Sequence, residues 1–342
     1  MTKQETAETA PGRTMMACAS HAPLMYCYAR APSVHAEVDE TFARVQREIE
    51  KFDPELVIIF GPDHYTSLFR NLAPPFTVAA KCEAVDDIGG HAGAFDVPDD
   101  LAIACVANLA ENGLDAAISY DLKVDHGISQ TLHRLTGSVD RYPVIPIIIN
   151  TMTAPLPPFH RSRLLGTLVG RFVKGLGKRT LFLGSGGLSH NPKVIYPDIG
   201  TGEANVTSWQ INGPLNDLMT REAWLDRLDE IHRVAAVMLA EGGISAADCC
   251  FNEAFDRQVI DLLAGGRFEE MDHWNNSAII AEAGIGAVEV HAWLAAAVAN
   301  CEAGGELPTC DIYAQAIEYG IALGIMHASP KVPAARLAEL VA

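Results

Sequence analysis

Four short apolar runs in this chain each lead, within a few residues, into a loop that carries a histidine. Such runs are typical of buried strands, and α/β proteins tend to keep their chemistry on the loops that follow their strands. The runs begin at Met15, Leu56, Ile118 and Leu181, and the histidines after them are His21, His64, His126 and His190. If these loops meet at one edge of a sheet, they bring four imidazoles into one pocket. The pattern therefore predicts metal ligands, proton shuttles or both.

The segment from Leu181 to Pro192, LFLGSGGLSHNP, shows this arrangement most sharply. Its glycines let the backbone turn tightly and approach a ligand closely, and Pro192 disfavours a simple helical continuation after His190. On this stretch alone, a glycine-rich turn with a solvated histidine is an equally good interpretation. The chain has twelve histidines, so coincidence is the alternative to a site. Four imidazoles in one pocket are nevertheless too many for a passive core.

A metal site built from imidazoles often includes a carboxylate, and Glu289 in GAVEVHAW is the candidate. It is flanked by apolar residues at the expected start of an alanine-rich helix. Burying an unpaired glutamate there would be costly, and metal coordination would remove that cost. The alternative is a glutamate on the solvent-facing side of the helix, which spacing alone favours. Glu253 and Glu282 are the rival carboxylates.

Composition limits the class of protein. The 342 residues are 49% hydrophobic and 20% charged, which fits a folded chain with a sizeable core. The net charge of −18 argues against a nucleic-acid partner, which would need a basic face. The eight cysteines form no C-x-x-C pair, and with no signal peptide evident this predicts reduced thiols in the cytoplasm. We expect a flexible, polar N-terminal tail over residues 1–14 and a single domain over residues 15–342.

Periodicity and turn residues predict the remaining elements. Helices are expected over 37–52, 101–112, 161–175, 221–241, 252–264 and 277–301, the last broken at 284–286. A strand is expected over 143–150, and the prolines of 71–78 indicate a loop with an edge strand. Residues 313–327 fit either a strand or a helix, and 193–215 read as an irregular connection or lid. The fold class is α/β, with a central mixed sheet flanked by helices on both sides and a more helical second half.

The motifs together resemble those of the class III extradiol ring-cleavage dioxygenases, the superfamily of protocatechuate 4,5-dioxygenase. The motifs that carry the resemblance are SHAPL at 20–24, FGPDHY at 60–65, VDHG at 124–127 and LFLGSGGLSHNP at 181–192. The resemblance continues through FDRQVIDLLAGGRFEEMD and VEVHAW, and so covers nearly the whole chain from Met15. Residues 193–224 and the longer N-terminal tail depart from the family pattern.

The resemblance implies a role for each site residue. His21, His64 and Glu289 would be the three protein ligands of a non-haem Fe(II), leaving coordination positions open. His126 would be the proton donor and His190 the proton acceptor of ring cleavage. Asp125 would orient His126 or bond the substrate, and Asp63 would support the neighbouring His64. Plain loop carboxylates are the alternative for both aspartates.

The resemblance further implies a reaction with O2 on a catechol that carries a short carboxylated side chain. The expected substrates are 3-(2,3-dihydroxyphenyl)propionate or 2,3-dihydroxycinnamate, opened to a hydroxy-keto-dienoate by a homo-oligomeric enzyme without nucleic-acid or membrane partners. The carboxylate partner would be one of four basic residues, Arg70, Lys123, Arg161 or Arg257. The alternatives are a different catechol, protocatechuate-like or of the biphenyl type, a zinc hydrolase that uses the same two histidines and glutamate, and a binding protein without activity.

Overall fold

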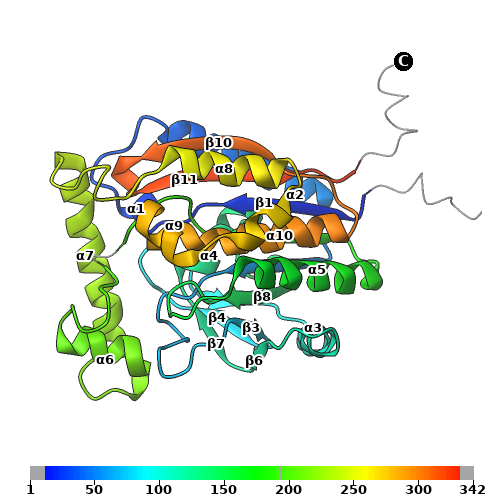
Figure 1. The fold of residues 1–342 in the computed structure, drawn as a ribbon, viewed down its shortest axis with the longest axis horizontal. Coiled ribbons are helices and arrows are strands. Elements are labelled where there is room, and N and C mark those ends of the chain that lie inside the picture. The colour runs from blue at the N-terminus through cyan, green and yellow to red at the C-terminus, as the bar shows by residue number, and fades with distance from the viewer. Residues whose placement is uncertain (1–11, 193–194, 332–342) are drawn as a thin grey trace, which may run out of the picture.

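The computed structural model describes residues 12–192 and 195–331, and it is organised around one eight-stranded sheet (Figure 1). The strand order is β10-β11-β1-β9-β2-β8-β3-β6. The strands are β1 (Thr14–Ala19), β2 (Leu56–Gly61), β3 (Phe76–Ala79), β6 (Ala117–Ser119), β8 (Val144–Ile149), β9 (Thr180–Ser185), β10 (Thr309–Ala316) and β11 (Ile321–Ala328). The predicted tail over 1–14 lies mostly outside the described residues, and its last residue, Thr14, is the first of β1.

The centre of the sheet is parallel, because β1, β9, β2 and β8 run side by side in the same direction. All residues of these four strands are buried, as expected for strands covered on both faces. On one side β11 and β10 are antiparallel, and on the other β3 is antiparallel to β8. The sheet is therefore mixed, which confirms the predicted fold class.

Helices cover both faces of the sheet because alternate strand residues point to opposite sides. Met16 and Cys18 of β1 pack in the same apolar cluster as the alanine-rich helix α10, whereas Met15 and Ala17 pack in the cluster that includes α2 and α4. The helices of the sheet layers are α2 (His35–Phe52), α3 (Asp99–Glu111), α4 (His126–Thr136), α5 (Phe159–Leu176), α8 (Glu253–Ala264), α9 (Asn276–Ala283) and α10 (Val290–Glu302).

A second group of helices stands beside the sheet, at the left of Figure 1. It comprises α6 (Ala204–Asn212), the 3-10 turn η1 (Gly213–Leu215) and the long helix α7 (Arg221–Glu241). Trp209 and Trp224 stack at its core, with ring centroids 5.7 Å apart. The prediction that 193–215 is irregular is therefore wrong for residues 204–212, where buried Val206 and Trp209 support a short helix. Residues 193–194 lie outside the described part of the chain.

Three other predictions need correction. β3 is not an edge strand: it lies between β8 and β6, and the prolines precede it at 74 and 75. The run that begins at Ile118, which we expected to be one strand, is two strands, β6 and β7 (Leu122–Val124). β7 belongs to a separate small sheet with β4 (Cys82–Ala84) and β5 (Gly93–Ala94). Residues 313–327 form parts of two antiparallel strands, β10 and β11, joined by the 3-10 turn η4 (Ile317–Tyr319).

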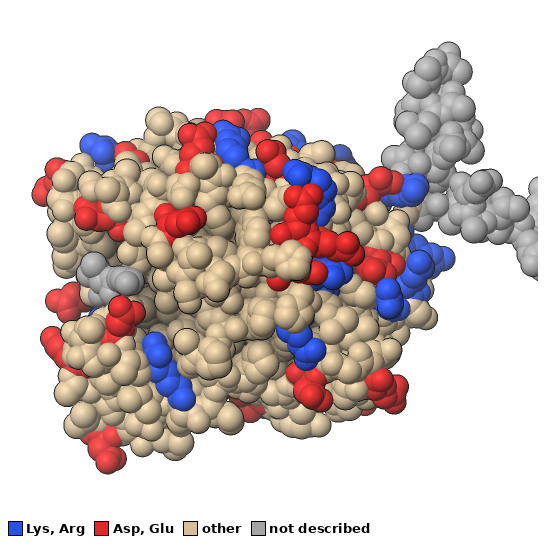
Figure 2. Space-filling model, in the orientation of Figure 1, with Lys and Arg blue, Asp and Glu red and all other residues tan. Residues whose placement is uncertain are grey.

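On the face shown in Figure 2, acidic and basic side chains lie around a broad uncharged area, and several of both signs lie close together at the right. None of the helices in the described residues is both long and apolar enough to cross a membrane.

Candidate active site

The four predicted histidines gather around one cavity of about 340 Å³. His21 and His64 follow the ends of β1 and β2, and His190 follows the end of β9, which lies between those two strands. His126 comes from elsewhere: it follows β7 of the small sheet and is the first residue of α4. The prediction that the four imidazoles share a pocket is confirmed, although one of the four loops leaves a different sheet.

Three of these imidazoles are close enough to hold a metal ion. One ring nitrogen of each of His21, His64 and His126 lies within 4.8 Å of the others. The rings of His64 and His126 are stacked, with centroids 4.7 Å apart and an interplanar angle of 4°. His21 meets both rings edge-on, at centroid distances of 5.5 and 5.6 Å.

Glu289 supplies the carboxylate of this cluster. It ends the 3-10 turn η3 (Ile285–Glu289), directly before α10, and is only 2% exposed. Its Oε2 lies 3.6 Å from His21 Nε2, and its Oε1 lies 3.4 Å from His64 Nε2. Burial alone would raise the pKa of Glu289, but the adjacent His21 and His64 rings lower it to about 2. The rivals Glu253 and Glu282 are exposed, so the structure favours Glu289.

The outer nitrogens of His21 and His64 are held by other side chains. His21 Nδ1 lies 3.0 Å from Ser185 Oγ, which donates in turn to Thr131 Oγ1 at 2.7 Å. His64 Nδ1 lies 3.0 Å from Asp125 Oδ1. If each Nδ1 carries the proton, each Nε2 presents a lone pair toward Glu289, as metal-binding histidines require. Burial lowers the pKa of His21 to about 3, which keeps that ring neutral.

The two aspartates predicted to assist the site do different work. Asp125 orients His64 and not His126: it accepts hydrogen bonds from the His64 backbone N–H at 2.8 Å and from Thr66 Oγ1 at 2.9 Å. Burial opposes its ionisation, but the adjacent His64 ring holds the pKa of Asp125 well below its usual range. Asp63 accepts the backbone N–H groups of residues 66–68 and so shapes the loop, with no hydrogen bond to the His64 ring.

The residue that orients His126 is Asp87, which the sequence analysis did not single out. Asp87 Oδ2 lies 2.5 Å from His126 Nδ1 and accepts the His126 backbone N–H at 3.2 Å. Asp87 follows β4 in a tight turn, where the Gly90 N–H donates to the Asp87 carbonyl at 2.9 Å. A Cβ at Gly90 would lie 2.0 Å from Asp87 Oδ1, so the turn requires glycine. Two aspartates followed by two glycines, DDIGG, were the available signal.

We expect Asp87→Asn to lower ring-cleavage activity roughly 10²-fold while leaving metal content unchanged. The amide can still contact His126, but it no longer provides a charged acceptor for the Nδ1 proton that sets which nitrogen faces the cavity. Steady-state rates and metal analysis on the same preparation check this. Asp86→Asn, at the neighbouring carboxylate, is the matched control and should behave as wild type. Loss of metal in step with activity would contradict a role through His126.

His190 occupies a slot cleared by two glycines. A Cβ at Gly187 or at Gly286 would lie 2.2 or 2.0 Å from His190 Cε1. His190 Nδ1 lies 2.9 Å from the Leu188 carbonyl oxygen, to which only a protonated nitrogen can donate, so Nε2 is the nitrogen free to exchange a proton. The preceding Ser189 is fixed by buried Asp256, which accepts its N–H and its hydroxyl at 2.7 Å each. The GSGG sequence thus provides space for the ring.

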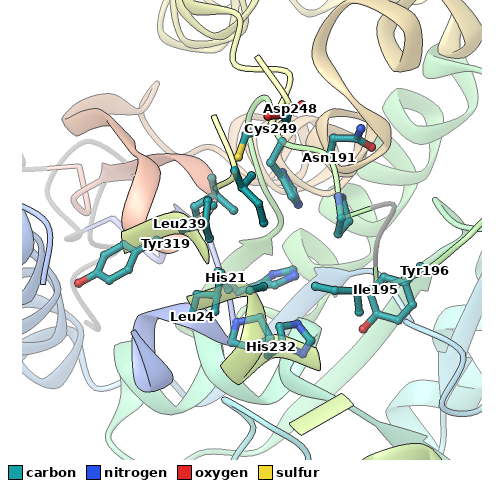
Figure 3. Close-up of a pocket in the computed structure, with 18 of the residues that line it drawn as sticks. His21, Leu24, Asn191, Ile195, Tyr196, His232, Leu239, Asp248, Cys249 and Tyr319 are labelled. Carbon is teal, nitrogen blue, oxygen red and sulfur yellow. The ribbon is translucent and has the colours of Figure 1, made fainter. Parts of the chain in front are cut away.

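Three further aromatic side chains line the cavity and were not predicted, namely Tyr196, His232 and Tyr319. Tyr196 stacks on His64 with centroids 5.6 Å apart. His232, on α7, is 2% exposed, and its Nδ1 lies 2.6 Å from the Leu228 carbonyl oxygen. Figure 3 shows His232 and Tyr196 facing the same space as His21. Both come from the helical second half, where the sequence offered no strand end to mark them.

None of the four basic residues expected to bind a substrate carboxylate lines the cavity, and the described part of its wall carries no lysine or arginine. Lys123 pairs with Glu83 and Asp121, and Arg257 pairs with Glu253. Arg70 lies over the Tyr65 ring, outside the cavity, and Arg161 is the third residue of α5.

Comparison with known proteins agrees with this geometry. Residues 15–320 match the family model described as the catalytic LigB subunit of aromatic ring-opening dioxygenase. The chain belongs to this family. It is 40% identical over 311 residues to the 2,3-dihydroxyphenylpropionate/2,3-dihydroxicinnamic acid 1,2-dioxygenase of Azotobacter vinelandii, covering 91% of this chain and 97% of that protein. It is 39% identical to the protein of the same name from Xanthobacter autotrophicus, covering 92% and 98% respectively.

The family membership confirms the prediction of a ring-cleavage dioxygenase. The dioxygenase names of the relatives agree with this prediction and not with the zinc hydrolase or the inactive binding protein. The protein is an enzyme of aromatic ring opening, with a buried histidine cluster that could hold a metal ion.

Proposed function

We propose that this LigB-family enzyme uses Fe(II) and O2 for extradiol cleavage of a 3-substituted catechol, with 3-(2,3-dihydroxyphenyl)propionate or 2,3-dihydroxycinnamate as substrates. The names of the relatives support the substrates. One observation carries the metal: Glu289 Oε2 is buried without a hydrogen-bond partner, 3.6 Å from His21 Nε2. A buried carboxylate oxygen in that state is stabilised by a cation.

The donor set fits ferrous iron. His21 and His64 offer imidazole nitrogens and Glu289 an oxygen, the combination found in non-haem Fe(II) oxygenases with open positions for substrate and O2. Bound there, the iron would supply the redox chemistry that brings catechol and O2 to reaction. The remaining steps belong to the protein, which orients the ring, excludes water and moves protons.

Two proton transfers are assigned to the other two histidines. His190 Nε2 takes a proton from a catechol hydroxyl as the substrate binds, because its Nδ1 is committed to the Leu188 carbonyl. His126 gives a proton to the developing oxygen anion during ring opening, because Asp87 Oδ2 holds its Nδ1 at 2.5 Å and leaves Nε2 for the transfer. Both oxygen atoms of O2 end in the ring-opened hydroxy-keto-dienoate.

We also propose that the enzyme acts as a cytoplasmic homo-oligomer. All eight cysteines are free thiols, which fits a reducing compartment. Helix α7 exposes Val234, Val237 and Met238 along one stripe, at 53%, 46% and 42% of their surface. An exposed apolar stripe of this kind is typical of a contact between subunits.

The direct test is anaerobic reconstitution with Fe(II), followed by O2 uptake and appearance of the yellow ring-opened product. We expect turnover with Fe(II) and none with Zn(II). The propionate-substituted catechol should exceed unsubstituted catechol about tenfold in kcat/KM, because each buried methylene contributes about 0.8 kcal/mol. Faster turnover of catechol or protocatechuate would contradict the substrate but not the reaction. Activity that follows Zn(II) would contradict the metal.

A further inference from the structure

Gln130 is a buried glutamine of α4 whose side-chain amide joins two loops of the site. It lies four residues after His126 and is only 1% exposed. Its Oε1 accepts the Ala22 N–H at 2.8 Å, and its Nε2 donates to the carbonyl oxygens of Ala22 and Gly89, at 3.0 Å each. The oxygen and both N–H groups of this amide are thus engaged, which no apolar or acidic side chain could reproduce.

The two loops that Gln130 joins carry different parts of the chemistry. One bonded residue directly follows His21, a proposed iron ligand. The other lies two residues after Asp87, whose carboxylate holds the His126 ring. The single amide therefore connects the His21 loop, the Asp87 turn and the helix that begins at His126.

The Asp87 turn also packs directly against the His21 loop. Gly89 has φ +76°, and a Cβ there would lie 2.7 Å from Pro23 Cα and 3.0 Å from Gln130 Nε2. Backbone therefore lies against backbone at this point, and only glycine fits. The Gln130 amide bonds both sides of that contact and so fixes the distance between the two loops.

The His21 loop has further anchors in the large sheet. The Ser20 N–H donates to the Gly324 carbonyl of β11 at 3.0 Å, and Ser20 Oγ accepts the Gly324 N–H at 2.9 Å. The Asp87 turn instead follows the three-residue strand β4 of the small sheet. Without the Gln130 amide, we therefore expect the Asp87 turn to move more than His21.

We infer that Gln130 is a positioning residue for ring cleavage. It holds the Asp87 turn against the His21 loop, so that the His126 ring keeps its place relative to the proposed iron site. The inference rests on the proposed function and adds a residue that acts through Asp87 and touches neither the substrate nor the metal ion.

The first test is Gln130→Met, which keeps the length of the side chain but removes its hydrogen bonds. In the Fe(II)-loaded enzyme we expect kcat to fall about ten- to thirtyfold, because a small misplacement of a catalytic group is costly. Iron content and substrate affinity measured without O2 should be retained. Normal kcat in folded Gln130→Met would overturn the inference, whereas a wild-type enzyme that cleaves no catechol would refute the proposed function.

Asn300→Leu is the control for the loss of a buried amide. Asn300 is fully buried near the end of α10, and its Nδ2 donates to the Glu306 carbonyl at 2.8 Å. We expect this variant to lose stability and to keep its kcat. An equal loss of kcat in both variants would show a general effect of destabilisation and would overturn the inference.

A double-mutant cycle tests whether Gln130 acts through Asp87. Residues of one network give non-additive effects. In an Asp87→Asn enzyme, Gln130→Met should therefore lower kcat by less than about threefold more, whereas in an Asp86→Asn enzyme it should have its full effect. Losses that simply multiply in the Asp87→Asn enzyme would overturn the proposed route.

Hydrogen exchange in the metal-free protein gives a readout that is independent of activity. The Gly90 and His126 N–H groups both donate to Asp87. We expect Gln130→Met to speed their exchange at least about fivefold, because local opening of the turn becomes easier, and Asn300→Leu to leave it unchanged. Unchanged exchange at both amides in Gln130→Met would overturn the inference.

Gly89→Ala disturbs the same contact from the other side and leaves the amide in place. Gly113→Ala is its matched control, because Gly113 has a similar φ of +82° but no atom within 4 Å of an added Cβ. We expect only Gly89→Ala to lower kcat, by about tenfold. Normal kcat in folded Gly89→Ala would overturn the inference, and so would failure of both Gln130→Met and Gly89→Ala to fold, since the contact would then be purely structural.

Discussion

His21→Ala, His64→Ala and Glu289→Ala are each expected to lose bound iron and ring-cleavage activity together. Each change removes one of the three proposed protein donors, and the Glu289 change also removes the charge that would offset the cation. Iron content after anaerobic reconstitution and O2 uptake on the same samples measure both effects. His160→Ala is the control, since His160 is exposed on α5 and should retain iron and rate.

The glutamate variant is the most discriminating of the three. Its side chain is buried, so a fold-stability measurement must accompany it. Removing a buried carboxylate from between two imidazoles should not unfold the metal-free protein, because Oε2 makes no hydrogen bond there and Oε1 makes only a long contact, 3.4 Å, with His64 Nε2. A folded Glu289→Ala enzyme with stoichiometric iron and near-normal turnover would refute the proposed ligand set.

His126→Gln and His190→Gln are expected to keep iron and catechol binding but to lose roughly 10²- to 10⁴-fold in ring cleavage. Glutamine preserves approximate size and some hydrogen bonding, but it cannot exchange a proton near neutral pH. Substrate affinity measured without O2 separates binding from the chemical step. The test matters most for His126, because one of its ring nitrogens lies within 4.8 Å of ring nitrogens of His21 and His64 and could therefore bind the same metal ion.

If His126→Gln loses iron in parallel with activity, His126 is a metal ligand and not the proton donor. Asp87 and Asp125 hold Nδ1 of His126 and His64 in the same way, so iron content, and not this contact, distinguishes a proton donor from a ligand. His190 has no such ambiguity, since it lies outside that three-histidine cluster.

The central part of the site was predictable because His21, His64 and His190 each follow a mostly apolar strand that is buried over its whole length. A parallel strand that is buried on both faces can be recognised in the sequence as a continuous apolar run. The loop that follows it lies at the carboxyl edge of the sheet. Glu289 could be singled out because Gly284 and Gly286 break the helical pattern just before it. Gly284 indeed has φ +86°, and its amide ends α9.

What the sequence did not reveal depends on contacts between distant segments. Asp87 reaches His126 across 39 residues, from a loop with no long apolar run before it. A local stretch of sequence does not determine the order of strands in the sheet. The prolines before β3 therefore led to the wrong prediction that β3 is an edge strand. Tyr120 and Asp121 divide two three-residue strands that pair with different sheets. His232 lines the cavity only because α7 stands against the ends of the strands.

The pairing of β1 with strands from the far end of the chain has a consequence for biosynthesis. Cys18 of β1 lies beside Gly184 on one side and Met326 on the other, so the sheet closes only when nearly the whole polypeptide has emerged from the ribosome. The proposed donors at 21, 64 and 289 are similarly far apart. Contacts of such long range form slowly. A metal ion held by all three proposed donors would therefore be acquired only when translation is nearly complete.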